Sequence, residues 1–356
     1  MNVRPIDVWP AHVEPPVQRA PLLQVEGLSV DFGTEDGLVR AVRDVSFRLH
    51  PGEVLGVVGE SGCGKSVSAA AVMGLLPRTA RVSGSIRFDG RELVGRPDEE
   101  LRELRGNRIG MVFQDPMTSL NPVYTVGWQL AEAFRAHHGG ASRKRGWAKA
   151  VEALEQVGIP QPDRRARQYP HEFSGGMRQR AMIAMAIVNE PDLIIADEPT
   201  TALDVTVQAQ ILETLRAAAS STGAAIMLIT HDLGVVAGMA DRVQVMYGGT
   251  VVESAETVRL FAHPRMPYTV GLLGSVPNAE QVGRALTPIP GAPPSPLNLP
   301  PGCTFGPRCP LVEPGCRTLE PALVMVDEPG HEARCVRWEE LTGQAGAEVL
   351  FGGGDD

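Results

Sequence analysis

The sequence predicts an α/β fold in which a mostly parallel sheet is covered by helices on both faces, and two observations predict it. Short apolar runs typical of strands alternate with segments of helical spacing between residues 192 and 247. A glycine-rich loop also stands between a valine-rich run at 53–58 and a helical segment at 65–76. Strands that alternate with helices pair in parallel, because each helix carries the chain back to the edge where the next strand begins.

Composition sets limits on the class of protein. The chain has 356 residues, enough for about two domains, and 43% of them are hydrophobic. The net charge of −9 does not favour a nucleic-acid partner. No apolar run approaches the roughly 18 to 20 residues of a membrane-spanning helix, and residues 1–16 lack the apolar core of a signal peptide. We therefore expect a cytoplasmic protein that works at a membrane only through a partner.

The first half of the chain predicts strands joined by turns. Residues 1–20 are rich in proline and are expected to form a flexible tail. A charged helix is expected at 99–105, and alternating or wholly apolar patterns predict strands at 22–32, 41–49, 85–88 and 109–113.

From Asp115 to Val188 the pattern becomes helical, with apolar residues at helical spacing in 126–137 and 148–157. The β/α alternation then returns. It predicts strands at 192–196, 224–230 and 242–247, and helices at 207–219 and 233–239.

After Phe261 many prolines make a long helix unfavourable, and four of the five cysteines follow. We expect a large α/β domain at 21–261 with a helical part at about 115–188, a loop-rich domain at 262–342, and a disordered tail at 343–356.

The glycine-rich loop has the sequence of a phosphate-binding site. Its eight residues fit the template of Gly, four residues, then Gly-Lys-Ser/Thr; they are Gly59, Glu60, Ser61, Gly62, Cys63, Gly64, Lys65 and Ser66. Glycines let successive N–H groups point at an anion, and the helix start adds its positive dipole end. Lys65 is expected to reach the β- and γ-phosphates, and the Ser66 hydroxyl to ligate Mg²⁺.

A second motif ends a buried strand in two acids. Residues 193–196 are Leu-Ile-Ile-Ala, and Asp197 and Glu198 follow. An aspartate in this position holds Mg²⁺ in phosphate-loop enzymes, and Glu198 would then act as the general base on the attacking water. The alternative is a strand that ends in a solvated acid pair.

A third loop supports a family resemblance. Ser174, Gly175 and Gly176 begin a helix and form another anion-binding turn, which a single phosphate site does not need. The arrangement resembles the ATP-binding subunits of ABC transporters, whose signature motif reads LSGGQ where this chain has FSGGM. In that family two subunits pair head to tail, and each signature loop closes on the γ-phosphate held by the partner's phosphate loop.

The resemblance covers residues 22–255. It implies a P-loop NTPase fold of the ABC type, with a RecA-like core, an antiparallel β subdomain, an α-helical subdomain and a small loop-rich C-terminal extension. It also implies roles for further residues: Gln114 as the glutamine that contacts Mg²⁺ and the attacking water, Asp204 within a loop that starts at Ala202, His231 as the residue that senses the γ-phosphate, and Phe32 as the aromatic that stacks on adenine.

Three stretches resemble the dipeptide and oligopeptide importers within this family. They are FSGGMRQR, which begins at Phe173, FQDPMTSLNP, which begins at Phe113, and HPRMPYT, which begins at His263 and precedes the cysteines. In a cytosolic protein the cluster of Cys303, Cys309, Cys316 and Cys335 favours a metal site over disulfides. Thiolates suit zinc and iron–sulfur clusters alike. Similar proteins hold a [4Fe–4S] cluster there, so the resemblance favours the cluster. Free buried thiols are the remaining alternative.

Together these observations predict an ATP hydrolase that powers an ABC importer of peptides at the cytoplasmic face of the membrane, with ATP and Mg²⁺ as cofactors. The resemblance implies a second, homologous ATPase subunit, two transmembrane permease subunits and an extracytoplasmic solute-binding protein as partners. An importer of nickel or of another small solute is the alternative, and a soluble ABC ATPase is a more distant one.

Overall fold

The computed structural model describes residues 20–115, 119–201, 204–275, 287–327, 329–341 and 347–351. Residues 1–19 of the expected N-terminal tail lie outside the described part. The expected disordered tail at 343–356 contains a short helix, α12 (Ala347–Phe351), and its other residues also lie outside the described part.

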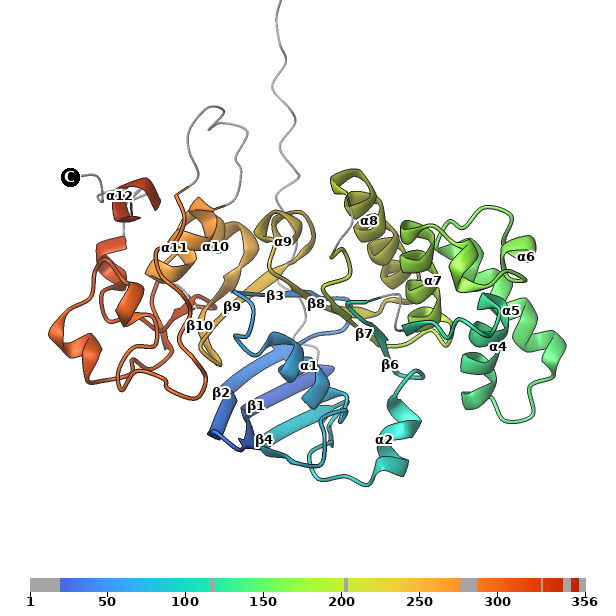
Figure 1. Ribbon diagram of the computed structural model, residues 1–356, viewed down its shortest axis with the longest axis horizontal. Coiled ribbons are helices and arrows are strands. Elements are labelled where there is room, and N and C mark those ends of the chain that lie inside the picture. The colour runs from blue at the N-terminus through green and yellow to red at the C-terminus, as the bar shows by residue number, and fades with distance from the viewer. Residues whose placement is uncertain are drawn as a thin grey trace, which may run out of the picture.

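A central sheet of eight strands crosses the molecule (Figure 1). Its spatial order is β11-β12-β10-β9-β3-β8-β7-β6, and neighbours from β9 to β6 pair in parallel. The strands are β3 (Val54–Val58), β6 (Ile109–Val112), β7 (Leu193–Asp197), β8 (Ala225–Thr230), β9 (Arg242–Tyr247), β10 (Thr250–Glu256), β11 (Val324–Met325) and β12 (Glu332–Ala333). The predicted mostly parallel sheet is therefore confirmed, and β10, β12 and β11 extend it with antiparallel pairs.

A second sheet of four antiparallel strands has the order β2-β1-β4-β5. Its strands are β1 (Leu23–Thr34), β2 (Gly37–Leu49), β4 (Ala80–Phe88) and β5 (Arg91–Glu92). Leu23 and Val25 of β1, and then Leu28 and Val30, are buried in the cluster between the two sheets. Side chains alternate along each half of the strand, and a register shift between Val25 and Leu28 moves the alternation by one residue.

Most of the helices gather in three places, and α2 lies apart from them beside the four-stranded sheet (Figure 1). Figure 1 shows α1 between the two sheets, α8 to α11 on the opposite face of the central sheet, and α4 to α7 as a separate group at one end. Their bounds are α1 (Lys65–Val72), α2 (Asp98–Leu104), α4 (Val126–His137), α5 (Arg143–Gln156), α6 (Pro162–Arg165), α7 (Gly175–Ile187), α8 (Val205–Thr222), α9 (Leu233–Met239), α10 (Thr257–Ala262) and α11 (Pro267–Gly274).

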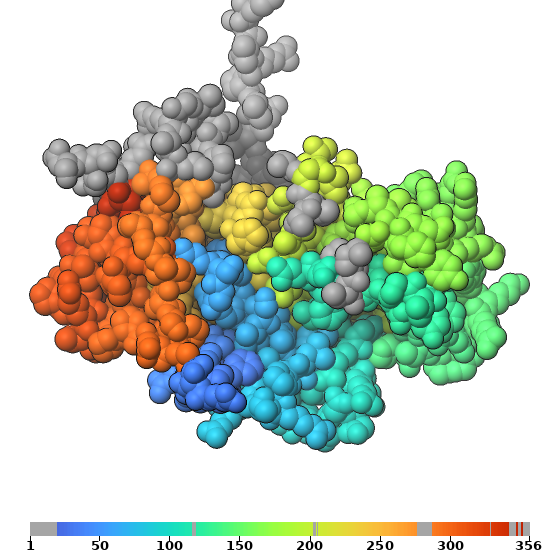
Figure 2. All heavy atoms as spheres, viewed as in Figure 1, coloured from blue at the N-terminus to red at the C-terminus, as the bar shows by residue number. Residues whose placement is uncertain are grey.

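Three hydrophobic clusters stabilise these layers. One joins α4, α5 and α7 to the central sheet, and one lies between the two sheets around α1. The third lies between the central sheet and the C-terminal region. The space-filling view in Figure 2 shows the C-terminal region and the helical group as opposite ends of one continuous body. Short 3-10 turns in the C-terminal region, at Gly306–Arg308, Pro314–Arg317 and Trp338–Leu341, agree with the expected loop-rich structure.

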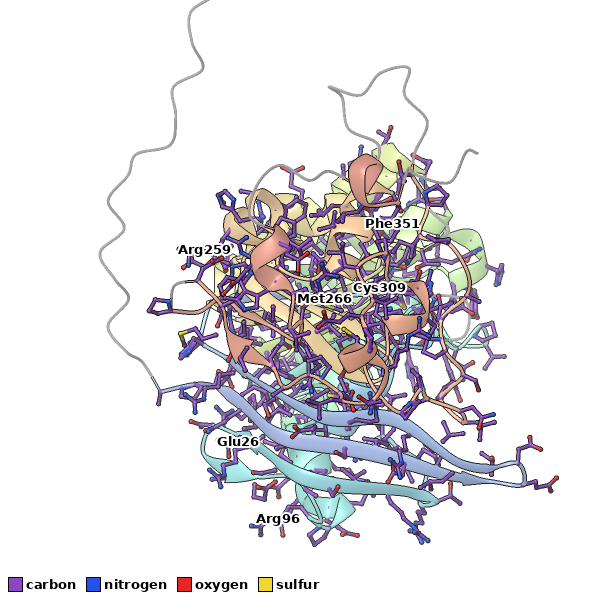
Figure 3. The ribbon with its side chains drawn as sticks, turned by 90° about the vertical axis from the view of Figure 1, so that its left-hand side faces the viewer. Glu26, Arg96, Arg259, Met266, Cys309 and Phe351 are labelled. Carbon is purple, nitrogen blue, oxygen red and sulfur yellow. The ribbon has the colours of Figure 1, made fainter. Side chains whose placement is uncertain are left out.

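The C-terminal region shares its core with the sheet. Tyr268 and Phe305 belong to the same cluster as Val58 of β3, and β12 pairs with β10. The fully buried Glu253 of β10 accepts a hydrogen bond from the backbone N–H of Arg265 at 2.6 Å and lies 2.9 Å from Nε2 of His331. Figure 3 shows this region end on, with Met266 and Cys309 near its middle.

Most predicted elements are confirmed to within a few residues. The largest differences are β10 and helices α10 and α11, which the sequence does not predict. Glu253 and Ser254 are polar but buried in β10, which hides the strand pattern. In α11, Pro267 occupies the first turn, where proline is compatible with a helix.

Candidate functional site

Four segments with candidate residues follow four neighbouring parallel strands. Val58 at the end of β3 pairs with Thr230 of β8, Ile229 pairs with Asp197 of β7, and Ala196 pairs with Val112 of β6. The carboxyl ends of these strands therefore meet at one edge of the sheet. The glycine-rich loop, Gln114, Glu198 and His231 all leave the sheet at this edge, which is where open α/β sheets bind ligands.

The glycine-rich loop holds Lys65 in place. The side chain of Lys65 is buried, and its ammonium group donates hydrogen bonds to the carbonyl oxygens of Gly59 and Glu60, at 2.7 and 3.1 Å. The ammonium group also donates to the sulfur of Cys63 at 3.7 Å. A buried ammonium group that has no carboxylate among these partners remains attractive to an anion. The site can therefore bind a negatively charged group beside the loop.

Two glycines of the loop allow its close approach to the rest of the chain. Gly64 has a φ of 103°, and a Cβ atom there would lie 2.5 Å from the carbonyl oxygen of Ala41. Gly59 has a φ of 153°, and a Cβ atom would lie 2.2 Å from the carbonyl oxygen of Met246. These contacts leave no room for a side chain, while nothing lies within 4 Å of a Cβ atom built on Gly62.

The expected magnesium ligands meet beside Lys65. The hydroxyl of Ser66 donates a hydrogen bond to Oδ1 of Asp197 at 2.9 Å. Burial raises the pKa of the Asp197 carboxyl above its ordinary value, although the hydrogen bond from Ser66 works in the opposite direction. A hydroxyl and a carboxylate at hydrogen-bonding distance are suitable oxygen ligands for Mg²⁺, and a divalent cation would reverse this pKa shift. The residues present thus fit a magnesium–triphosphate group.

Glu198 is the centre of a second group of polar side chains. Its Oε2 accepts hydrogen bonds from Nε2 of Gln114 at 3.0 Å and from the hydroxyl of Thr201 at 2.9 Å. Its Oε1 lies 3.4 Å from Nδ1 of His231. The backbone of Glu198 has a φ of 47°, a left-handed conformation that costs energy in a non-glycine residue. The strained residue is therefore the one whose carboxylate contacts Gln114 and His231, which follow two other strands of the sheet.

The remaining expected residues lie at helix starts or on the second sheet. Ser174 caps α7, accepting a hydrogen bond from the backbone N–H of Met177 at 3.3 Å. Asp204 caps α8, accepting one from Val207 at 3.0 Å. Figure 1 shows α7, which begins at Gly175 and Gly176, at a distance from α1 and its loop. Within one chain, the second anion-binding turn is therefore not part of the first site.

Phe32, Cys63 and Ser61 were also expected at the site, and the structure places each of them. Phe32 lies on β1 and packs, half-buried, against the cluster between the two sheets. Cys63 is buried, and burial raises the pKa of its thiol, which makes it a poor nucleophile. Ser61 is exposed at the outer turn of the loop. Ala202 and Leu203, expected beside Asp204, and residues 116–118 of the FQDPMTSLNP stretch lie outside the described part.

Three side chains that the sequence analysis missed contact the site. They are Thr201, whose hydroxyl holds Glu198, and Tyr268 and Arg308, which hold Glu60 of the loop. Thr201 follows Glu198 closely in the chain, so its position could have suggested the contact. Tyr268 and Arg308 lie more than 200 residues from Glu60, and no local pattern indicates them.

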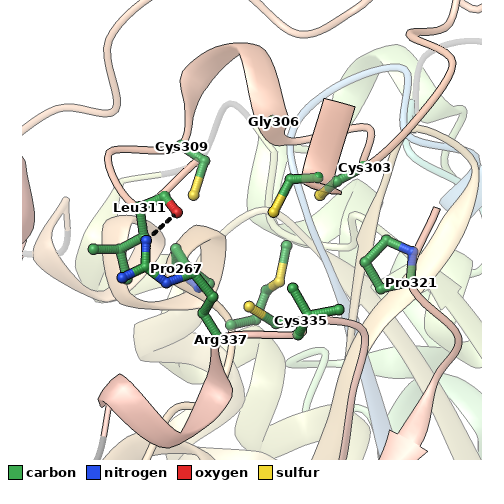
Figure 4. Close-up of a pocket in the computed structure, with 11 residues that line it drawn as sticks. Pro267, Cys303, Gly306, Cys309, Leu311, Pro321, Cys335 and Arg337 are labelled. Carbon is green, nitrogen blue, oxygen red and sulfur yellow. Dashed lines mark hydrogen bonds between the residues drawn. The ribbon is translucent and has the colours of Figure 1, made fainter. Parts of the chain in front are cut away.

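The four C-terminal cysteines line one small cavity. Figure 4 shows Cys303, Cys309 and Cys335 turned toward the same space, and Cys316 completes the set. Burial raises the pKa of Cys309 to about 11 and that of Cys335 to about 12, so these free thiols are protonated at neutral pH. Met266 and Leu311 add apolar walls.

The cysteines do not form a ready site for a single metal ion. Throughout the described ranges, no three side chains of His, Cys, Asp or Glu are arranged to hold one. The expectation of a bound metal is therefore not supported by a preformed single-ion site.

Comparisons with known proteins give consistent results. The family model described as ABC transporter matches residues 42–201, and that of the oligopeptide/dipeptide transporter C-terminal region matches residues 252–316. The chain is 57% identical to the oligopeptide transport ATP-binding protein OppD of Mycobacterium tuberculosis over 93% of its own length. It spans about half of that relative, 54% of its length.

Two shorter relatives are covered almost completely. The chain is 48% identical to a putative peptide import ATP-binding protein of Brucella abortus, covering 91% of the chain and 99% of the relative. It is 51% identical to the dipeptide transport ATP-binding protein DppD of Bacillus subtilis, covering 88% and 94%.

Solved structures share the fold. A dimeric post-hydrolysis structure of the ATP-binding cassette MJ0796 with ADP and Pi has a TM-score of 0.60 and 27% identity, and covers 66% of this chain and 98% of that one. The protein cbiO1 of Clostridium perfringens has a TM-score of 0.58 and 29% identity, and covers 68% and 92%. Among the helices described here, none is both long and apolar enough to cross a membrane.

Proposed function

The chain belongs to the ABC transporter family, and from this premise we propose that it is the ATP-binding and ATP-hydrolysing subunit of a peptide importer. The observation that carries the proposal is the meeting of Lys65, the Ser66–Asp197 pair and the Glu198 group at one edge of the parallel sheet. The peptide class rests on the relatives OppD and DppD and on the matching C-terminal region.

In this proposal the glycine-rich loop binds the triphosphate. Lys65 and the backbone N–H groups of the loop contact the phosphates, and Phe32 stacks on the adenine. Ser66, Asp197 and Gln114 would hold Mg²⁺, which when bound neutralises the charge that develops on the phosphates. Their oxygen atoms and the hydrogen bond between Ser66 and Asp197 support this assignment.

Glu198 is then the general base that takes a proton from the attacking water. Gln114 and Thr201 orient its carboxylate through two hydrogen bonds to the same oxygen. The other oxygen faces His231, which is mostly exposed at the same edge. A side chain in this position can respond to a group that enters beside Glu198, so we assign His231 to sensing the γ-phosphate.

The second half of each site comes from another subunit. Ser174, Gly175 and Gly176 lie away from the loop of the same chain, and the related cassette MJ0796 is described as dimeric. We propose a head-to-tail dimer with a homologous ATPase, bound to two permease subunits at the cytoplasmic face of the membrane and served by an extracytoplasmic solute-binding protein. Within it, residues 21–261 form the ATPase domain and residues 262–342 the C-terminal domain.

Uptake measurements test the proposed function. A strain of the source organism that lacks this chain should lose uptake of a labelled tripeptide, and a restored gene should return it. A restored gene with Glu198→Gln should fail. If the strain instead keeps peptide uptake and loses uptake of nickel ions, the substrate class is wrong while the family assignment stands.

For the cysteine cavity we propose a [4Fe–4S] cluster rather than zinc. Four thiols line one cavity, and a cubane cluster takes one thiolate at each of four separate irons. Its ligands therefore stand farther apart than those of a single ion. The raised pKa values of Cys309 and Cys335 mean that binding would release protons, so loading should improve as the pH rises.

Replacing Cys309 by serine should remove the cluster and leave ATP binding in place. We expect iron and acid-labile sulfide to fall to background in protein purified without oxygen, with loss of the broad visible absorption. Cys63→Ser is the matched control for iron content, because Cys63 is the one cysteine outside the cavity. Zinc in place of iron in the parent protein would contradict the proposal.

A further inference from the structure

The C-terminal region holds the phosphate loop through one residue, Glu60. The guanidinium group of Arg308 donates two hydrogen bonds to the Glu60 carboxylate, at 2.6 and 3.0 Å. The backbone N–H of Glu60 donates one to the hydroxyl of Tyr268 at 2.9 Å. The carbonyl of Glu60 accepts the bond from Lys65 described above. The same carbonyl also accepts a hydrogen bond from the backbone N–H of Cys63 at 3.4 Å. Every polar group of Glu60 thus has a partner, and two of the four partners, Tyr268 and Arg308, come from beyond residue 261.

The side chain of Arg308 is held in one position by its surroundings. Its side chain is 6% exposed, and its remaining N–H groups donate to the carbonyl oxygens of Pro290 and Ile289 at 2.9 and 3.4 Å and to the hydroxyl of Tyr247 at 3.2 Å. A buried guanidinium group with all its donors satisfied and a bidentate carboxylate has one geometry. Arg308 therefore fixes the direction of the Glu60 carboxylate.

An aromatic cluster packs beside the contact between Arg308 and Glu60. The rings of Tyr247, Tyr268 and Phe305 lie with centroids between 4.5 and 5.4 Å apart, and all three are fully buried. Phe305 and Arg308 lie between Cys303 and Cys309, which both line the cysteine cavity. The segment 303–309 therefore joins the cavity to the phosphate loop.

We propose that Arg308 is a positioning residue for the nucleotide site. It neutralises Glu60 and directs its carboxylate into the C-terminal region, so that Lys65 meets the phosphates instead of a neighbouring carboxylate. Without Arg308, the negative charge of Glu60 would lie unpaired in the loop, where it would repel the triphosphate and compete for the ammonium group of Lys65. The proposal rests on the proposed function, since it takes ATP as the ligand of the loop.

Arg308→Met tests this role in the full-length protein. We expect its affinity for a fluorescent ATP analogue to fall about tenfold. Glu60→Gln added to Arg308→Met should restore most of the affinity, because a neutral amide neither repels phosphate nor captures Lys65. Arg308→Lys should give a smaller loss, since it keeps the charge but loses the bidentate geometry.

Arg43→Met is the matched control. Arg43 makes the same kind of bidentate pair with Glu320 of the C-terminal region, at 3.0 and 2.8 Å, but it does not contact the loop residues Glu60 or Lys65. The ATP affinity of the Arg43→Met protein should stay within about twofold of that of the parent protein. Thermal unfolding of each variant identifies any that fails to fold, and Arg308→Lys then carries the comparison.

Amide hydrogen exchange without nucleotide separates this inference from the proposed function. Arg308→Met should raise exchange about tenfold in the loop, residues 59–66, and Arg43→Met should not. If the parent protein does not bind ATP but Arg308→Met still raises exchange in the loop, the proposed function is refuted. The effect of Arg308 on the loop then still stands. Unchanged affinity and exchange in Arg308→Met, or no recovery in the double variant, would overturn the positioning role.

Discussion

Glu198→Gln is expected to reduce ATP turnover by about 10²–10⁴ while ATP binding remains. The glutamine keeps the size of the side chain and an oxygen that accepts hydrogen bonds from Gln114 and Thr201, but it cannot take a proton from water. The left-handed backbone at this position is equally available to both residues. The measurements are phosphate release under steady state and equilibrium binding of ATP.

The same variant tests the dimer. If hydrolysis is the step that opens the closed pair of subunits, Glu198→Gln with ATP and Mg²⁺ should accumulate as a dimer, which light scattering after size exclusion detects. Glu190→Gln is the matched control, because Glu190 also has a left-handed backbone, with a φ of 54°, but lies exposed at the surface. Turnover of Glu198→Gln close to that of this control would show that another group acts as the base.

The local parts of the site could be predicted from the sequence because their determinants are local. A glycine-rich loop between a strand and a helix specifies its own backbone. Asp197 ends a strand that is buried along its whole length, and Glu198 follows it. The meeting of Glu198 with Gln114 and His231 could be expected from the parallel sheet, since neighbouring strands end at one edge.

Contacts between distant segments could not be predicted in this way. Arg308 and Glu60 are 248 residues apart, and no pattern in either stretch of sequence indicates the other as its partner. The strand β10 was missed because Glu253 is buried there, and its buried partner His331 comes from a segment 78 residues later. The position of Cys335 in the cysteine cavity also depends on a contact between distant segments. Ala333 of β12, two residues before Cys335, pairs with Glu253 of β10.

Lys65→Met is expected to weaken ATP binding on the order of a hundredfold. The ammonium group of Lys65 is the one cation that the loop itself supplies, and its two carbonyl partners hold it without neutralising its charge. Methionine fills the same space without that charge, so the loop should keep its shape and lose its attraction for phosphate. Lys149→Met, which removes a surface lysine paired with Glu152, is the control.

The two variants should separate binding from turnover. Lys65→Met should fail to bind a fluorescent ATP analogue at concentrations that saturate the parent, whereas Glu198→Gln should bind it and not hydrolyse ATP. A mixed dimer of the two would contain one competent loop and one competent base in different subunits. If each site takes its phosphate loop from one chain and its Ser174 turn from the other, with the base beside the loop, the mixture should not recover turnover. Recovery would place Glu198 across the subunit interface from the phosphates that it serves.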